Sequence, residues 1–218
     1  MIVVIPTLNL NHLNDFFSDI ENVDLDSVDR FFVFNNSVKK WNSSNSKIHV
    51  INLGKNMGVN YVWNQGLQIA LQKNMDLMLI NDDIVFKPNF FKKTQEALDK
   101  LKSPVIVCPK TTNQFFKFDN AVFKGRNKYS KLYKRQGWAF TISRDTIPLI
   151  KRIPEELNIF FGDDWIFHFT KNLWVIDHSN VVFHFVGKTM ATNPEKRRLL
   201  EYERQIFKEK IKGLENIE

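Results

Sequence analysis

LMLINDDIVF, residues 77–86, has the pattern of a buried strand that ends in acids and decides how the rest of the chain is interpreted. Its apolar run is interrupted by Asn81, Asp82 and Asp83 and resumes at Ile84. Ligands of a parallel α/β sheet bind beyond the carboxyl ends of its strands, and adjacent carboxylates there suit Mg²⁺ or Mn²⁺. Such acids can also simply end a strand and cap a turn. Acids within buried structure are costly, however, unless they are solvated or bound to a cation.

The segments on either side alternate between strand and helix patterns. Short apolar runs predict strands at 2–5, 31–34, 48–53, 77–80 and 105–107. Apolar residues at helical spacing predict helices at 13–20, 59–71 and 90–101. This alternation is typical of a parallel α/β sheet. Beyond Pro109 it stops, and we expect a strand at 138–142, a helix at 163–171, two paired strands at 174–176 and 181–185, and an amphipathic helix at 195–214.

The composition suits one globular domain with a real core, since 43% of the 218 residues are hydrophobic. The only cysteine, Cys108, excludes an internal disulfide and a Cys-rich zinc site. The net charge of +7 favours anionic partners. No apolar run approaches the roughly 20 residues of a membrane span. The N-terminus lacks the charged leader of a signal peptide, so we expect a cytoplasmic protein.

A second acidic pair, Asp163 and Asp164, lies in FFGDDWIF between large apolar side chains. Desolvation by these neighbours could raise a carboxyl pKa, as a general base requires. The same residues are also a good helix start, and both interpretations can hold together. His184 lies in VVFHFVGKT, near the expected end of a strand. A lone histidine is more often structural than a metal ligand.

In their order and spacing, these motifs resemble glycosyltransferase family 2, whose members have the GT-A fold. The resemblance covers roughly residues 2–187 through VVIPTLN, FNNS, NLGKNMGVNYVWNQGLQIA, INDDIVFKPNF, GWAFTISRDTI, FFGDDWIF and HFVGKT. It implies a Rossmann-like, mainly parallel central sheet flanked by helices, in a single domain over residues 1–218. Within that domain, 1–110 would be the nucleotide-sugar-binding half, 111–190 the acceptor and catalytic half, and 191–218 a C-terminal amphipathic helix.

The resemblance also implies a metal-dependent, inverting transfer from a nucleotide-sugar donor of UDP or dTDP type. Asp83 and His184 would hold the Mn²⁺ or Mg²⁺ ion, and Asp164, with Asp163 second, would be the base. Asn81 stands where the family has the first acid of its Asp-X-Asp motif. The implied donor-binding residues are Pro6, Thr7, Asn9, Asn35, Asn36, Asn56, Asn60, Asn64, Asn81 and Asp82, the last of which is also a second candidate metal ligand.

The expected acceptor segment, residues 117–135, holds seven basic residues and a single acid, with aromatic residues between them. This pattern suits a nucleic-acid backbone and its bases, so one expected acceptor is a polyanion such as hydroxymethylated phage DNA. A cell-surface or lipid-linked glycan is the alternative, and a merely solvated loop explains the charge equally well. The expected acceptor-binding residues are Gly137, Trp138, Arg126, Lys128, Tyr129 and Lys131.

Two other function classes stay open. A non-catalytic nucleic-acid-binding α/β module would explain the basic segment but not the two acidic pairs, since acids beside phosphate repel it unless a cation intervenes. A nucleotidyltransferase also uses carboxylates at strand ends, but it would usually need a Gly-rich phosphate loop near the N-terminus. VVIPTLNLN contains no such loop.

Overall fold

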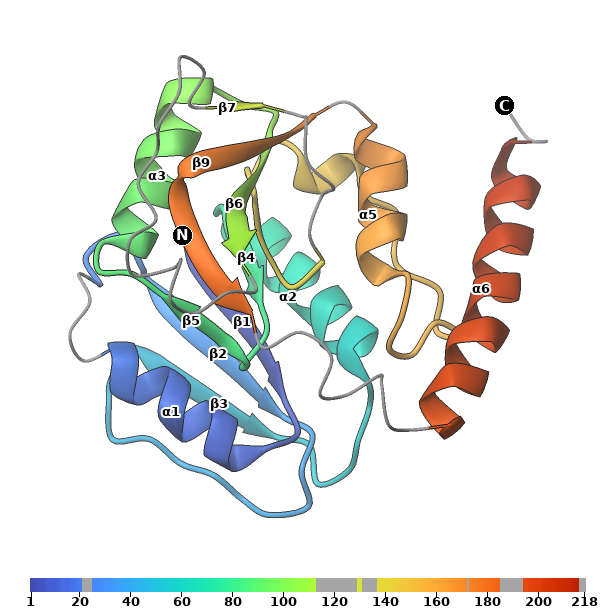
Figure 1. Ribbon diagram of the computed structural model, residues 1–218, viewed down its shortest axis with the longest axis horizontal. Helices are drawn as coiled ribbons and strands as arrows, with labels where there is room; N and C mark the ends of the chain where they lie inside the picture. Colours follow the sequence, from blue (N-terminus) through green and yellow to red (C-terminus); the bar gives the residue numbers. More distant parts are fainter. Residues whose placement is uncertain (21–24, 113–128, 131–136, 172, 185–193, 216–218) are drawn as a thin grey trace.

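A computed structural model describes residues 1–20, 25–112, 129–130, 137–171, 173–184 and 194–215. Nine strands form one sheet in the order β3-β2-β1-β4-β8-β6-β9-β5, with β7 paired to β9 (Figure 1). The strands are β1 (Ile2–Thr7), β2 (Arg30–Asn35), β3 (Ile48–Asn52), β4 (Leu77–Ile80), β5 (Ile84–Phe86), β6 (Ile106–Thr112), β7 (Tyr129–Ser130), β8 (Ala139–Ile142) and β9 (Trp174–His184). The helices are α1 (Leu10–Ile20), α2 (Val59–Lys73), α3 (Phe90–Leu101), α5 (Gly162–Thr170) and α6 (Pro194–Glu215), with a 3₁₀ turn at Ile147–Leu149.

The first half of the chain builds a parallel sheet. β1 lies between β2 and β4 and runs parallel to both, and β3 adds to β2 in the same direction. β8 then enters antiparallel between β4 and β6, while β9 runs parallel to β6. The predicted mainly parallel α/β sheet flanked by helices is therefore confirmed.

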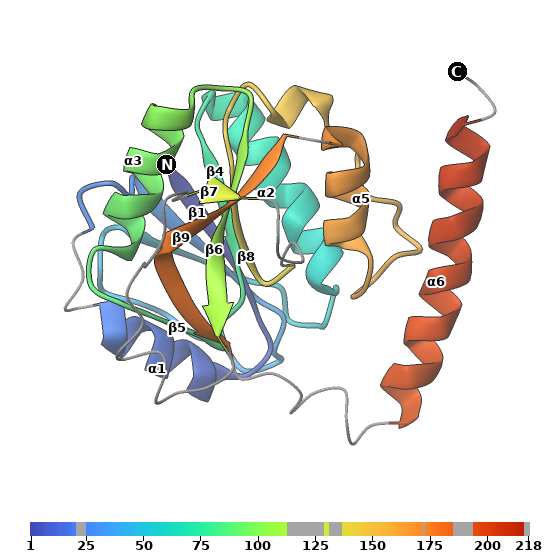
Figure 2. The ribbon, with the colours of Figure 1, turned by 45° about the horizontal axis from the view of Figure 1, so that its top comes forward.

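Both faces of the sheet are covered, which explains why its central strands are apolar without alternation. In β1, Ile2 and Val4 belong to the core shared with α2 and α5, whereas Val3 and Ile5 belong to the core shared with α1 and α3. α6 lies beyond α5 at the margin of the molecule in both views (Figures 1 and 2). Among the helices described here, none is long and apolar enough to cross a membrane.

The prediction of two paired strands at 174–176 and 181–185 is wrong. Trp174–His184 is one strand, β9, whose pairing with β6 shifts register where Pro109 faces Asp177 and Lys110 faces Val181. The residues between them form an insertion in β9, in which Asp177 Oδ1 accepts hydrogen bonds from the Ser179 backbone N–H and hydroxyl. The turn-forming residues 178–180 thus form a bulge within one strand and do not reverse the direction of the chain.

Candidate active site

Strand pairing places Asp83 beside His184. The short strand β5 runs antiparallel to the end of β9, and Ile84 faces His184 in that register. Asp83 comes directly before Ile84, so its carboxylate reaches the imidazole: Asp83 Oδ2 lies 3.3 Å from His184 Nε2. Both side chains are mostly buried, with exposed fractions of 22% for Asp83 and 13% for His184.

Three buried polar atoms in this region have no hydrogen-bond partner among the described residues: Asn81 Oδ1, Asp83 Oδ1 and His184 Nδ1. Buried polar atoms in native proteins are rarely left unpaired, and each such atom requires an explanation. Carboxylate oxygen and imidazole nitrogen are both ligands of divalent ions. The arrangement therefore has the character of a site that a cation or a polar ligand completes.

Asp83 and His184 lie close enough for one divalent ion to bind both side chains, since Asp83 Oδ2 and His184 Nε2 are 3.3 Å apart. Within the described ranges, no group of three or more His, Cys, Asp or Glu residues could hold a metal. Mg²⁺ commonly takes one or two protein carboxylates and completes its shell with water and substrate phosphates, so a two-residue site is sufficient.

Trp138 holds the His184 ring from one side. The two rings stack at 4.5 Å with an interplanar angle of 13°. The indole Nε1 of Trp138 donates to Thr111 Oγ1 at 3.0 Å, and its backbone oxygen accepts from the Asn81 N–H at 2.9 Å. Trp138 was predicted to bind the acceptor, and the structure shows that His184 covers one face of its ring. Sequence analysis did not identify Thr111.

The second acidic pair occupies the first turn of α5. A Cβ on Gly137 would collide with the Asp163 carboxylate, so the close approach of these two residues requires glycine at 137. Gly137 directly precedes Trp138, which contacts His184. Asp163 and His184, the partner of Asp83, therefore contact the adjacent residues Gly137 and Trp138.

Asp82 connects the ends of β1 and β4. Thr7, which is buried at the end of β1, donates a hydrogen bond from Oγ1 to Asp82 Oδ2 at 2.5 Å. Burial raises the pKa of Asp82 to about 6, and the neighbouring charge of Asp83 acts in the same direction. The hydrogen bond from Thr7 partly opposes this rise.

Two predicted donor-binding residues at the end of β2 use their side chains to organise neighbouring loops. Asn35 Nδ2 donates to the Lys39 backbone oxygen and to Asn52 Oδ1, at 2.7 and 2.8 Å. Asn36 Oδ1 accepts from the Met57 N–H at 2.8 Å. These bonds tie the end of β2 to the segment that leads into α2.

Two further predicted donor-binding residues, Asn60 and Asn64, lie on α2 and face the loop before α5. Asn60 Nδ2 donates to the backbone oxygens of Leu157 and Phe160, at 3.0 and 2.9 Å. The Asn64 amide accepts from the Ile153 N–H and donates to its carbonyl oxygen, both at 2.9 Å. Their buried amides therefore hold this loop against the helix.

The remaining predicted donor residues occupy less enclosed positions, apart from Pro6, which is buried in β1. Asn9 and Asn56 are exposed; Asn9 Oδ1 accepts from the Asn11 N–H at 3.1 Å, and Asn56 Oδ1 accepts from the Gly58 N–H at 3.0 Å. These local bonds shape the starts of α1 and α2.

Three of the six predicted acceptor residues lie outside the part of the chain that the structure describes. These residues are Arg126, Lys128 and Lys131. The backbone of Tyr129 is described in β7, where it pairs with Asp177 of β9.

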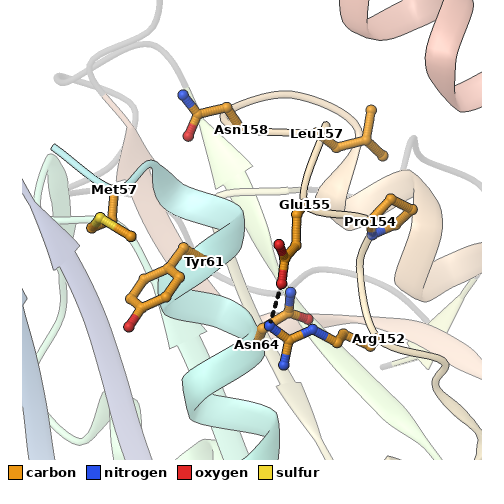
Figure 3. Close-up of a pocket in the computed structure, with 8 residues that line it drawn as sticks. All are labelled: Met57, Tyr61, Asn64, Arg152, Pro154, Glu155, Leu157 and Asn158. Atoms are coloured by element: carbon orange, nitrogen blue, oxygen red, sulfur yellow. Dashed lines mark hydrogen bonds and ion pairs between the residues drawn. The ribbon is translucent and has the colours of Figure 1, made fainter.

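A pocket of about 240 Å³ lies between α2 and the loop at 152–158 (Figure 3). Two of its lining residues on the loop form an ion pair, in which Arg152 Nη2 donates to Glu155 Oε1 at 3.0 Å. Asn64 lines this pocket, but Asn81, Asp83 and His184 do not. The lining residues are Met57, Tyr61, Asn64, Arg152, Pro154, Glu155, Leu157 and Asn158.

Comparison with known families decides the assignment, because residues 3–156 match the family model described as Glycosyl transferase family 2. The chain belongs to glycosyl transferase family 2. The match includes the strand-end acids and Gly137–Trp138 but ends before α5, β9 and α6. Among curated proteins, no sequence matches this family 2 chain.

Two solved structures show the GT-A fold of this family 2 protein. S. aureus TarS 1-349 has a TM-score of 0.58 and 13% identity, covering 84% of this chain and 59% of that one. The mannosyltransferase PcManGT from Pyrobaculum calidifontis, in complex with GDP-Man and Mn²⁺, has a TM-score of 0.55 and 13% identity, covering 87% of this chain and 57% of that one. The family 2 chain thus spans less than two thirds of the length of either structure.

Proposed function

We propose that the protein transfers a sugar from a nucleotide-sugar donor to an acceptor hydroxyl, with a divalent cation held by Asp83 and His184. The observation that carries this proposal is the buried Asp83–His184 pair with its unpaired polar atoms, set at a strand end in a family 2 protein. Structures of similar fold support it: TarS 1-349 was solved in complex with UDP and with UDP-GlcNAc, and PcManGT with GDP-Man and Mn²⁺.

In this proposal, the Asp83–His184 site acts on the leaving diphosphate, and the acids of α5 act on the acceptor hydroxyl. A bound Mn²⁺ or Mg²⁺ would offset the negative charge that develops on the departing diphosphate. The bond from the anomeric carbon to the diphosphate oxygen breaks as a bond from that carbon to the acceptor oxygen forms. The acceptor proton passes to a carboxylate of α5. Attack opposite the leaving group inverts the anomeric configuration.

Asp164 is the proposed base. Asp163 packs against Gly137, so it supports the acceptor-side segment directly. Asp164 follows it in the first turn of α5 and is half-buried. A carboxylate in hydrogen-bonding reach of the acceptor hydroxyl typically contributes 10²–10⁴-fold in rate as a general base.

Single-turnover transfer with Mn²⁺ and a panel of nucleotide-sugars tests this assignment. Asp164→Asn is expected to lower the transfer rate at least about 100-fold while donor binding is retained. Asp163→Asn is expected to have the smaller effect. Asp145→Asn, which makes the same change at an exposed acid, is the matched control and should transfer normally. A folded Asp164→Asn variant with near-normal transfer would contradict the assignment.

The proposed acceptor is a polyanion that carries a hydroxyl group, such as hydroxymethylated DNA. Its support is the charge of the sequence: a net +7, with seven basic residues and one acid at 117–135. Contacts to phosphates make binding fall steeply with salt. Titration of the protein with a DNA duplex across a salt series is therefore the test. Absence of binding at low salt would contradict the DNA version and favour a glycan acceptor.

A further inference from the structure

Glu203 is a fully buried carboxylate on α6, whereas Glu195, Glu201 and Glu209 of the same helix are exposed. Its oxygens accept hydrogen bonds from two successive backbone N–H groups: Phe160 N lies 2.7 Å from Oε2, and Ile159 N lies 3.2 and 3.3 Å from the two oxygens. A buried carboxylate is tolerated when hydrogen bonds of this kind replace its hydration. The position of Glu203 is therefore tied to the conformation of this backbone segment.

The segment bound by Glu203 leads directly into the acidic pair. Phe161 follows it in the left-handed conformation, with φ of 61°, and is the N-cap of α5 without a side-chain cap of its own. Asp163 and Asp164 come two and three residues later. Small changes of backbone direction at 159–161 would thus move both carboxylates relative to Gly137.

The same segment is also held from the other side. Asn60 of α2 donates to the Phe160 carbonyl oxygen at 2.9 Å. Phe160 is therefore bound through its N–H by α6 and through its carbonyl oxygen by α2. Phe207, one turn after Glu203 on α6, stacks on Phe161 with ring centroids 5.4 Å apart. α6 therefore contributes both a hydrogen-bond acceptor and an apolar support for the start of α5.

We propose that Glu203 is a positioning residue: through the backbone of Ile159 and Phe160, it sets the orientation of the Asp163 and Asp164 carboxylates. The inference rests on the proposed function of that acidic pair. It also gives α6, which lies beyond the family match that ends at residue 156, a specific part in the active site. A displacement of about 1 Å at a catalytic group can cost 10²-fold in rate.

Glu203→Gln tests the proposal because it keeps the size of the side chain but replaces an accepting oxygen with an amide that opposes the backbone N–H groups. Glu209→Gln, an exposed position on the same helix, is the control with the same change of charge. The measurements are hydrogen exchange of the amides at 159–164, kcat and KM of transfer, and the thermal shift caused by UDP with Mn²⁺.

For Glu203→Gln we expect exchange at 159–164 to rise at least about tenfold and kcat to fall about 10–100-fold. Donor KM and the thermal shift should stay within about twofold of wild type, because Asp83 and His184 lie on other elements. Glu209→Gln should change none of these. If Glu203→Gln does not fold, Glu203→Asp, which keeps the charge on a shorter side chain, should show the same changes to a smaller extent.

Unchanged exchange at 159–164 in Glu203→Gln would overturn the proposal, since the carboxylate would then not hold the segment. Faster exchange with unchanged kcat would overturn it as well, while the transferase function would stand. A wild-type protein that neither binds nor turns over any donor would instead contradict the proposed function, and the positioning role in catalysis with it. The two failures are therefore distinguished by the wild-type result.

Discussion

Asn81, Asp82 and Asp83 follow one strand yet take part in three different interactions. The Asn81 N–H donates to the Trp138 backbone, Asp82 accepts from Thr7, and Asp83 faces His184. Each interaction joins β4 to a different neighbouring element. Single substitutions in this triplet are therefore expected to have separable consequences.

Asp82→Asn is expected to change how stability depends on pH. The unfolded chain releases the Asp82 proton near the ordinary pKa of 3.8, whereas burial keeps it bound in the native protein up to about 6. The native state therefore binds more protons across this window, and wild-type stability falls as pH rises from about 4 to 6. The free energy of unfolding of Asp82→Asn should therefore increase relative to that of wild type between pH 4 and pH 7, by at most about 3 kcal/mol.

Urea unfolding at pH 4 and pH 7, with EDTA present, measures this gain. Because asparagine can still accept from Thr7, the hydrogen bond itself is retained in the variant. A stability difference between the two proteins that is the same at both pH values would contradict the raised pKa of Asp82.

Trp138→Leu is expected to weaken Mn²⁺ binding about tenfold, since residues that orient a metal ligand typically contribute 10–100-fold to affinity. The substitution removes the ring that stacks on His184 and the indole that donates to Thr111. Thr111→Val, which removes only the acceptor of the indole N–H, should have a smaller effect. Electron paramagnetic resonance of free Mn²⁺ gives the affinities, and equal values for Trp138→Leu and wild type would refute the orienting role.

Between elements, buried asparagines fasten a loop to a helix. Asn60 and Asn64 lie one turn apart on α2, so their side chains project from the same face. Together they bind backbone groups from Ile153 to Phe160. These bonds act together with Ile153 and Leu157, whose side chains belong to the core, to give the loop a defined conformation up to the start of α5.

Asn64→Ala is expected to lower the free energy of unfolding by about 2–4 kcal/mol, because it leaves two buried backbone groups of Ile153 without partners. Gln68→Ala, at an exposed position on the same helix, should change it by less than about 0.5 kcal/mol. Urea denaturation of the three proteins measures both effects. Similar midpoints for Asn64→Ala and wild type would show that water replaces the lost bonds.

For the whole molecule, donor and ion binding should be visible as stability. A ligand at 100 times its Kd that binds only the native state stabilises it by about 2.7 kcal/mol, which corresponds to roughly 5–10 °C in Tm for a chain of this size. We expect UDP or dTDP with Mn²⁺ to produce such a shift, and EDTA to abolish most of it. A shift that is equally large in EDTA would contradict the role of the ion, and Asp83→Asn provides the matched variant.

The sequence alone determined the class of fold, because hydrophobic periodicity is a local property. Continuous apolar runs identified β1, β2, β3 and β4 as strands, and helical spacing identified α1, α2 and α3. The acids at the end of β4 and at the start of α5 could also be recognised as site candidates from the local sequence, because burying a charge among apolar residues is costly. Family membership followed from the order of these motifs.

Only the tertiary structure decided how these parts meet. The register of β5 on β9 brings Asp83 to His184, and a pattern of single residues cannot specify pairing across a hundred positions of chain. Asn60 and Glu203 satisfy backbone groups far away in sequence, and their partners become visible only when the loop is folded. Element type depends on neighbours along the chain, whereas register and the satisfaction of buried polar groups depend on neighbours in space.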